Sequence, residues 1–295
     1  MNRVITAGVD GSRESLDAAD WAAREAVRRG LPLRLLHATD GHRTRTGLPE
    51  LDVTAARLNG ALSRAAISLS YAHPGLEIRA RHITGPPVPA LVEATTEAEV
   101  LVLGSRGFTG FAAFMVGSVA LGVTLRAERP VVLVRAGELP EDAREPDVDG
   151  APSRRTAYRP VVLGLDLTRP SDELIAYAFD AAASRGAPLR VVHGWTLPPL
   201  SAYVPAVTVT ADPPDLEMDT LQQLREAMRP WRHKYPDTPV SEHLVYGTAG
   251  HVLLKASLVA SLVVIGRRRR VSRLGRVAHS VIHHVTCPVA VVPHD

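Results

Sequence analysis

The feature that most constrains this chain is an internal repeat, in which the second half of the sequence copies the first at an offset of 156 positions. The match has no gap over its first thirty positions, from Gly8 to His37. The matched residues are Gly8, Asp10, Arg13, Ser15, Ala22, Ala26, Arg29, Gly30, Pro32, Leu33, Arg34 and His37, which recur as Gly164, Asp166, Arg169, Ser171, Ala178, Ala182, Arg185, Gly186, Pro188, Leu189, Arg190 and His193. This period is too long for a solenoid unit, so each copy predicts a complete domain produced by duplication.

Each copy is predicted to alternate strands with helices. In the first copy we expect strands at 3–9, 32–38, 77–83, 100–104 and 130–135. The expected helices are one capped by Ser12 or Ser15 and ended by Gly30, and three at 51–72, 87–96 and 117–127. This alternation predicts an α/β fold class with two Rossmann-like domains, each a five-stranded parallel sheet sandwiched by helices. Ligands of such sheets bind at the carboxyl ends of the strands, where the strand order reverses.

The segment between the copies differs from both of them. It is rich in Pro, Gly and acidic residues, which is typical of an exposed linker. We therefore predict a first domain at 1–136, a linker at 137–158 and a second domain at 159–295. The two domains are expected to pack as an internal pseudo-dimer through a sheet edge, because an open edge strand is otherwise left unpaired. Further self-association and an unknown protein partner stay open.

Composition places the chain among globular proteins and excludes several classes. Hydrophobic residues make up 45% and charged residues 22%, and the net charge is +3. No apolar run approaches the roughly 20 residues needed to cross a bilayer, and no signal-peptide pattern precedes the first strand. The single Cys287 cannot form an internal disulfide. A cytoplasmic protein without a membrane span is the expectation.

The strongest functional signal follows the fourth strand of the first copy. Gly104-Ser105-Arg106-Gly107 is followed by nine residues and then by Gly117-Ser118, which open the last helix. Glycines permit positive φ and a close approach of the backbone to a ligand, and free N–H groups at a helix start receive phosphate oxygens. Ser118 adds a hydroxyl donor. Arg106 either pairs with a phosphate or faces solvent.

This spacing, complete at a strand end in a five-strand repeat, resembles the ATP-binding branch of the universal stress protein family. The resemblance covers nearly the whole chain apart from the linker. The supporting segments are Val9-Asp10-Gly11-Ser12, His37-Ala38, Gly85-Pro86-Pro87 and Arg129-Pro130-Val131-Val132-Leu133-Val134. It implies an adenine nucleotide alpha hydrolase-like fold and ATP, with or without Mg²⁺, as the cofactor.

The resemblance also implies the residues of the nucleotide site. They are Val9, Asp10, Ala38, Gly104, Arg106, Gly107, Gly117, Ser118 and Val119. Asp10 is expected to contact the ribose or to help hold Mg²⁺ on the phosphates, and otherwise to be a turn residue. No metal site formed by the protein alone is expected, because His283, His284 and Cys287 do not share one helix face.

The second copy departs from the motif. Arg269 stands where the second glycine is expected after Gly266, the loop to Gly275 is four residues shorter, and Arg276 replaces the serine. We interpret this half as degenerate, with a second site at Asp166, Gly266 and Gly275 as the alternative. The arginines between Arg267 and Arg276 fit a solvated loop, an anion site or, less well because no aromatic residues are interleaved, a nucleic-acid surface.

The sequence therefore predicts an ATP-binding regulatory or stress-response protein, capable at most of slow hydrolysis and not a dedicated enzyme. The phosphate-loop pattern Gly-x-x-x-x-Gly-Lys does not occur. The enzymatic alternative is an adenylate-handling enzyme of the same superfamily, although the loop after the first strand lacks the paired glycines of such enzymes. The second alternative is a module that binds an anion or nucleic acid through Arg267–Arg276.

Overall fold

The computed structural model describes residues 3–39, 49–105, 116–196, 213–271 and 273–295. The elements of the N-terminal half are β1 (Val4–Gly8), α1 (Arg13–Arg29), β2 (Leu33–Thr39), α2 (Pro49–Ala72), β3 (Ile78–Thr84), α3 (Pro87–Ala94), the 3-10 turn η2 (Thr95–Glu97), β4 (Ala98–Ser105), α4 (Ser118–Thr124) and β5 (Val131–Arg135). Those of the C-terminal half are β6 (Val161–Gly164), α5 (Asp172–Ala183), β7 (Leu189–Trp195), α6 (Pro213–Lys234), β8 (Val240–Tyr246), α7 (Ala249–Ser257), β9 (Leu262–Arg268), α8 (Arg276–His284) and β10 (Val289–His294). The predicted alternation of strands and helices is confirmed in both halves.

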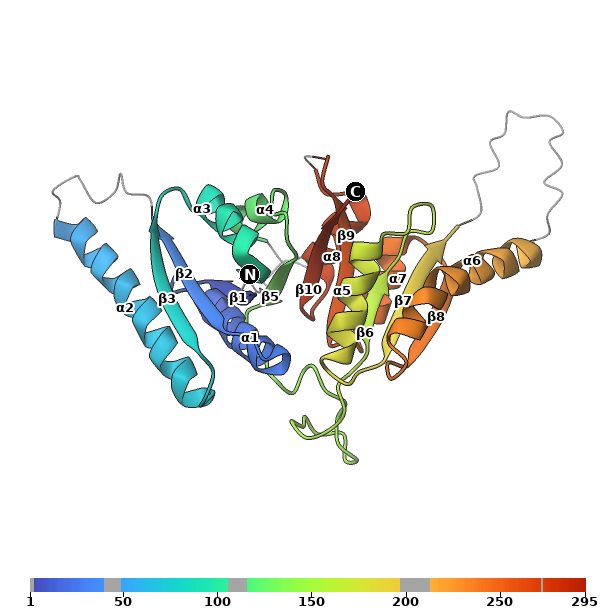
Figure 1. Cartoon of the computed structure of the whole chain (residues 1–295), viewed down its shortest axis with the longest axis horizontal. Coiled ribbons are helices and arrows are strands. Elements are labelled where there is room, and N and C mark those ends of the chain that lie inside the picture. The colour runs from blue at the N-terminus through green and yellow to red at the C-terminus, as the bar shows by residue number, and fades with distance from the viewer. Residues whose placement is uncertain (1–2, 40–48, 106–115, 197–212, 272) are drawn as a thin grey trace.

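The ten strands found in the described residues belong to one continuous sheet. Its order is β3-β2-β1-β4-β5-β10-β9-β6-β7-β8, and every pair within a half is parallel. The predicted five-stranded parallel sheet is therefore confirmed in each half. The halves join where β5 and β10 pair antiparallel, with Val131 opposite Val291 and Leu133 opposite Val289. This pairing covers an edge strand of each sheet and places the two halves side by side (Figure 1).

Helix α1 shows how the sequence defines these elements. Ser12 is its N-cap, and the Ser12 side chain accepts a hydrogen bond from the backbone N–H of Ser15. The helix ends at Gly30, which has φ 61° and donates its N–H to the carbonyls of Ala26 and Val27. Only glycine adopts this left-handed conformation without strain, which explains why the helix stops there.

Two hydrophobic layers enclose the sheet. Side chains of α1, α2, α5 and α6 pack on one face, and those of α3, α4, α7 and α8 pack on the other. Each layer contains residues of both halves, as Trp21 and Phe179 in the first layer illustrate. In the described parts of the chain, no helix is both long enough and apolar enough to span a bilayer.

A buried ion cluster also joins the halves, between α1 and the end of α5. The carboxylate of Glu25 accepts hydrogen bonds from Arg28 at 2.8 Å, from Arg29 at 2.6 Å and, across the interface, from Arg185 at 2.7 Å. Burial acts to raise the pKa of Glu25, but the guanidinium groups of Arg185, Arg28 and Arg29 outweigh it and hold the pKa well below its usual range. The cluster is fully hydrogen-bonded at its carboxylate, as a buried charge requires.

The segment that connects β5 to β6 is tied to α1, although the sequence predicts an exposed linker. Most of its residues are exposed or half-buried, but Glu138 and Ala143 are buried. Glu138 forms an ion pair of 2.5 Å with Arg24 of α1. The Tyr158 ring lies under the guanidinium groups of Arg28 and Arg144, at 5.5 and 3.9 Å from its centre. Long-range pairs of this kind have no local sequence signal.

Candidate functional site

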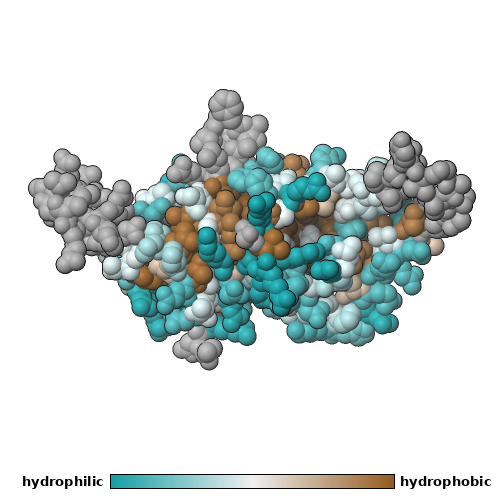
Figure 2. Space-filling view, turned by 90° about the horizontal axis from the view of Figure 1, so that it is seen from above, coloured by the Kyte–Doolittle hydropathy of each residue, from teal (hydrophilic) through white to brown (hydrophobic). Residues whose placement is uncertain are grey.

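A pocket of about 510 Å³ opens at the carboxyl ends of β1, β2 and β4 in the N-terminal half. The strand order reverses between β2-β1 and β4, so the pocket lies at the position where open α/β sheets bind ligands. We call it the N-terminal pocket. It is lined by Gly8, Val9, Asp10, Ser12, Glu14, Ser15, Leu36, His37, Ala38, Pro87, Leu91, Leu103, Gly104, Gly117, Ser118, Val119 and Ala120. The space-filling view from above shows hydrophobic surface on this face of the molecule, surrounded by hydrophilic surface (Figure 2).

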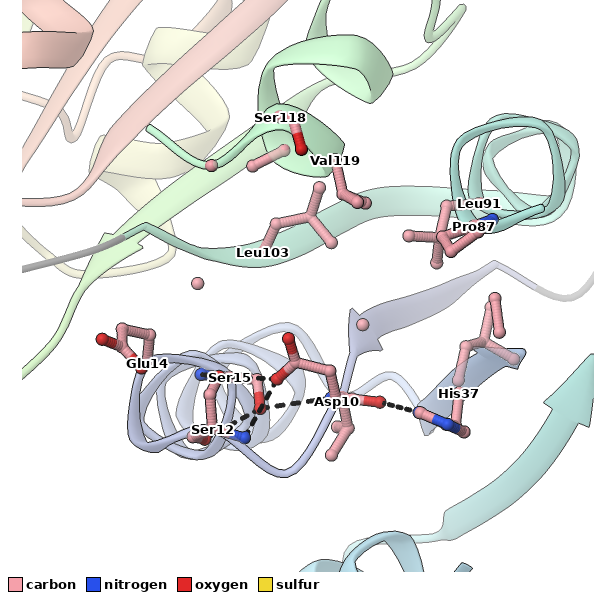
Figure 3. Close-up of a pocket in the computed structure, with 17 residues that line it drawn as sticks. Asp10, Ser12, Glu14, Ser15, His37, Pro87, Leu91, Leu103, Ser118 and Val119 are labelled. Atoms are coloured by element: carbon pink, nitrogen blue, oxygen red, sulfur yellow. Dashed lines mark hydrogen bonds between the residues drawn. The ribbon is translucent and has the colours of Figure 1, made fainter. Parts of the chain in front are cut away.

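The structure brings together most of the residues that the sequence predicts for the nucleotide site. Val9, Asp10, Ala38, Gly104, Gly117, Ser118 and Val119 all line the N-terminal pocket. Arg106 and Gly107 lie outside the described residues. Strand β1 and α1 present one wall, whereas β4 and the start of α4 present the opposite wall (Figure 3).

The start of α4 supplies hydrogen-bond donors to the pocket. Gly117 is the N-cap, and the first turn closes with a hydrogen bond of 2.9 Å from the Leu121 N–H to the Gly117 carbonyl. The backbone N–H groups of Ser118 and Val119 have no acceptor among the described residues. The Ser118 hydroxyl group adds a further donor at the same place (Figure 3).

The two described glycines of the motif have different roles, and neither needs a positive φ. A Cβ atom at Gly104 would lie 2.5 Å from the backbone carbonyl of Glu14, so this glycine permits α1 to pack against β4. Gly117 has φ −61°, and a Cβ atom there would have no protein atom within 4 Å. The expectation that positive φ explains these glycines is wrong at both positions. Only Gly117 leaves open space toward a ligand.

Asp10 lies in a tight turn at the end of β1. Its Oδ1 atom accepts hydrogen bonds from the Ser12 backbone N–H at 3.0 Å and from the Ser12 hydroxyl at 2.5 Å. Burial acts to raise the pKa of Asp10, but the hydrogen bonds from Ser12 and Ser15 outweigh it, so the pKa falls below its ordinary value. The carboxylate is therefore ionised at neutral pH.

Several pocket residues were not assigned a role from the sequence. Glu14 adds a second carboxylate, and Pro87 and Leu91 of α3 and Leu103 of β4 form an apolar wall (Figure 3). These apolar residues carry no sequence signal that separates them from core residues. His37, whose Nδ1 lies 2.6 Å from the Val9 carbonyl oxygen, positions the loop after β1. The repeat identifies His37, because His193 makes the same contact with Leu165 at 2.8 Å.

The C-terminal half has a pocket at the corresponding place, of about 580 Å³, which we call the C-terminal pocket. Its lining includes all three residues predicted for a second site, Asp166, Gly266 and Gly275. Asp166 repeats the turn of Asp10, since its Oδ1 accepts from the Thr168 N–H at 3.0 Å and from the Thr168 hydroxyl at 2.7 Å. Gly275 also has open space around its Cβ position.

The two pockets differ in charge. The N-terminal pocket contains two carboxylates, Asp10 and Glu14, and no arginine among its described residues. The C-terminal pocket contains one carboxylate, that of Asp166, and several arginines. At Gly266, His294 occupies the space beside the backbone, because a Cβ atom there would lie 2.5 Å from its Nε2. The two halves thus share a fold but not a ligand environment.

Cys287 is a packed side chain, as the sequence suggests. It is partly buried against the second hydrophobic layer, and burial raises the pKa of its thiol to about 12. A protonated thiol is a poor nucleophile at neutral pH.

The fold defines a tandem Rossmann-like α/β protein in which each half has a pocket at the carboxyl ends of its strands. The profile described as "Universal stress protein family" matches residues 1–135 and 157–293, so the chain belongs to this family. The curated relative Rv2005c, a universal stress protein of Mycobacterium tuberculosis, is 32% identical over 305 residues that cover 97% of this chain and 96% of the relative.

A solved structure of the full two-domain length has the same fold. A universal stress protein from Archaeoglobus fulgidus superimposes over 100% of both chains with a TM-score of 0.72 and 19% identity. Another universal stress protein, described as a complex with cAMP, resembles 46% of this chain over 98% of its own length, with 27% identity and a TM-score of 0.36.

Proposed function

We propose that the protein binds ATP, together with Mg²⁺, in the N-terminal pocket and acts as a nucleotide-dependent regulatory or stress-response protein. The observation that carries this proposal is the open side of Gly117 at the switch point of the sheet, next to the Ser118 and Val119 N–H groups, which have no acceptor in the described part of the chain. Membership of the universal stress protein family supports it.

The residues of the N-terminal pocket fit this ligand. The apolar wall of Pro87, Leu91 and Leu103 suits an adenine ring, and Val9 and Ala38 line the pocket beside this wall. The Val9 N–H donates to the Leu36 carbonyl and the Val9 carbonyl contacts His37, so Val9 is proposed to act through its shape. Backbone N–H groups at Ser118 and Val119, with the Ser118 hydroxyl, suit phosphate oxygens. We propose the same phosphate contact for Gly104, Arg106 and Gly107.

The negative charge of the pocket is the reason for proposing that Mg²⁺ binds together with ATP. Asp10 and Glu14 repel a free triphosphate, but carboxylate and phosphate oxygens together are the ligands that Mg²⁺ prefers. Asp10 is the residue that would contact the ion or the ribose, because one of its carboxylate oxygens is fixed by Ser12. Binding is thus expected to require the cation.

Regulation by occupancy fits this site better than rapid catalysis. Neither a phosphate-loop lysine nor paired glycines after β1 occur in the sequence. We further propose that residues 1–136 and 159–295 are two domains, joined by the linker 137–158, and that the second domain does not bind Mg²⁺-ATP tightly.

The experiment is equilibrium binding of labelled ATP with Mg²⁺ to the full chain, followed by chromatography of the nucleotide after long incubation. Retained ATP, or its slow conversion to ADP, is the expected result. Rapid release of pyrophosphate would indicate an adenylate-handling enzyme instead. Absence of binding would overturn the proposal.

A further inference from the structure

Five arginines line the C-terminal pocket, and one of them, Arg267 of β9, is buried. The other four are Arg169 in the loop after β6, Arg268 at the end of β9, Arg273 in the next loop, and Arg276 at the start of α8. These four arginines are all exposed to solvent. Three of the positions belong to the segment in which the glycine motif is lost.

The side chains of these four arginines have no hydrogen-bond or ion-pair partner among the described residues. Two neighbouring arginines behave differently. Arg267 is buried and donates to the carbonyl oxygen of Ala127 in the other half. Arg269 forms ion pairs with Glu128, Glu173 and Asp295, at 3.4, 3.5 and 3.3 Å. The arginine segment is therefore divided into structural residues and residues available to a ligand.

The charge at this pocket is uncompensated. Asp166 is the one carboxylate in the described lining, and Thr168 donates hydrogen bonds to one oxygen of that group. Like charges held around one cavity repel each other, and a ligand with several negative charges relieves this repulsion. Guanidinium groups bind phosphate with paired, charge-assisted hydrogen bonds.

The shape of the cavity favours a small molecule. A volume of about 580 Å³ lies in the range of small-molecule sites. No Phe, Tyr or Trp is found in the described lining, so the stacking platform of a single-stranded nucleic-acid site is missing there. The His294 side chain fills the space beside Gly266, so a ligand cannot approach the Gly266 backbone closely there.

We propose that the C-terminal pocket is a site for a compact, multiply phosphorylated anion, held by the side chains of Arg169, Arg268, Arg273 and Arg276 without a divalent cation. This site is independent of the ATP site proposed above, because it uses a different pocket and different chemistry. Mg²⁺ weakens binding here, since the cation competes with the arginines for phosphate oxygens.

The test is calorimetric titration of tripolyphosphate into the full chain in the presence of EDTA. We expect one site, with affinity falling from tripolyphosphate to pyrophosphate to orthophosphate and with rising salt. The double variant Arg273→Gln, Arg276→Gln is expected to weaken tripolyphosphate binding at least about tenfold. Arg270→Gln is the matched control, because Arg270 is exposed on the same segment but does not line the pocket.

Three results would overturn the proposal. One is the absence of tripolyphosphate binding by a folded protein, and another is binding that the double variant leaves unchanged. The third is tighter binding of a single-stranded oligonucleotide than of tripolyphosphate, lost in the double variant, which would assign the arginines to nucleic acid. Gly117→Val separates the two proposals, since it leaves tripolyphosphate binding intact even if ATP binding is lost.

Discussion

Arg267 of β9 donates a hydrogen bond to the backbone carbonyl oxygen of Ala127, in the opposite half of the molecule. The reverse contact comes from Arg135 of β5, which donates to the carbonyl of Val285 at 3.1 Å. Ala127 follows α4 and Val285 follows α8, so each half binds the end of the last helix of the other. Both arginines are buried. The two contacts, with the β5–β10 pairing, make the halves one unit.

Arg267→Gln is expected to lower the free energy of unfolding by about 1 to 3 kcal/mol. The shorter side chain leaves the Ala127 carbonyl without its buried partner, and an unpaired buried acceptor carries a desolvation penalty of about that size. Urea unfolding measures the change. Arg270→Gln serves as the exposed control and should stay within about 0.5 kcal/mol of the wild type. Equal stabilities of the two variants would contradict a structural role for Arg267.

Glu25→Gln is expected to destabilise the protein by about 3 to 5 kcal/mol at neutral pH. Removal of the carboxylate leaves Arg28, Arg29 and Arg185 close together without their counter-charge. Glu93→Gln, at an exposed position on α3, is the control. A loss no larger than that of the control would show that the cluster contributes little.

The same cluster predicts how stability depends on pH. The pKa of Glu25 is lowered in the folded state, so its contribution is full above the ordinary carboxyl pKa and is lost as pH falls toward the folded-state value. Wild-type stability should therefore fall below about pH 4.5, near the ordinary pKa of a Glu side chain. Glu25→Gln should flatten this part of the curve. Thermal unfolding of the wild type and of Glu25→Gln, at several pH values from neutral to acid, measures how the stability of each protein depends on pH.

Gly104→Ala and Gly117→Ala should separate packing from binding. The methyl group at Gly104 meets the Glu14 backbone at 2.5 Å, so we expect a loss of about 1 to 3 kcal/mol in stability as α1 is displaced. At Gly117 the methyl group enters open space, and the change in stability should stay within about 1 kcal/mol. Denaturant unfolding distinguishes them. Equal losses would mean that Gly117 also serves packing.

Asp10→Asn should weaken Mg²⁺-ATP binding at least about tenfold, equivalent to about 1.4 kcal/mol. The amide oxygen keeps the hydrogen bonds from Ser12, so the turn is retained while the charge is removed. Asp166→Asn makes the matched change in the other half and should alter the affinity by less than about twofold. Fluorescence titration with a labelled ATP gives both affinities. An effect of Asp166→Asn as large as that of Asp10→Asn would place Mg²⁺-ATP in both halves.

Local patterns in the sequence predict the elements well and the contacts between distant residues poorly. Ser12 and Gly30 identify the ends of α1, because caps are a local property of the chain. The spacing of Glu25 from Arg28 and Arg29 is that of ordinary ion pairs on a helix surface. The burial of Glu25 depends on Arg185, 160 residues away, and no local pattern reveals that partner.

The candidate site divides in the same way. The repeat and the glycine spacing locate both pockets. They do not reveal that Gly104 permits α1 to pack closely against β4, whereas Gly117 faces open space. In the arginine segment, Arg267 and Arg269 have the same sequence neighbourhood as Arg268. Only the fold shows that the side chains of Arg267 and Arg269 bond to protein groups, whereas Arg268 lines the C-terminal pocket with no such partner among the described residues.

The most direct test of the central claim is calorimetric titration of ATP with Mg²⁺ into the wild type and into Gly117→Val and Gly275→Val. Both glycines are N-caps with the same backbone conformation, φ −61° and −60°, and with no protein atom within 4 Å of a Cβ atom, so the variants should fold alike. We predict one Mg²⁺-dependent site that Gly117→Val abolishes and Gly275→Val leaves unchanged. Binding that survives Gly117→Val, or no binding by the wild type, would contradict the assignment of ATP to the N-terminal pocket.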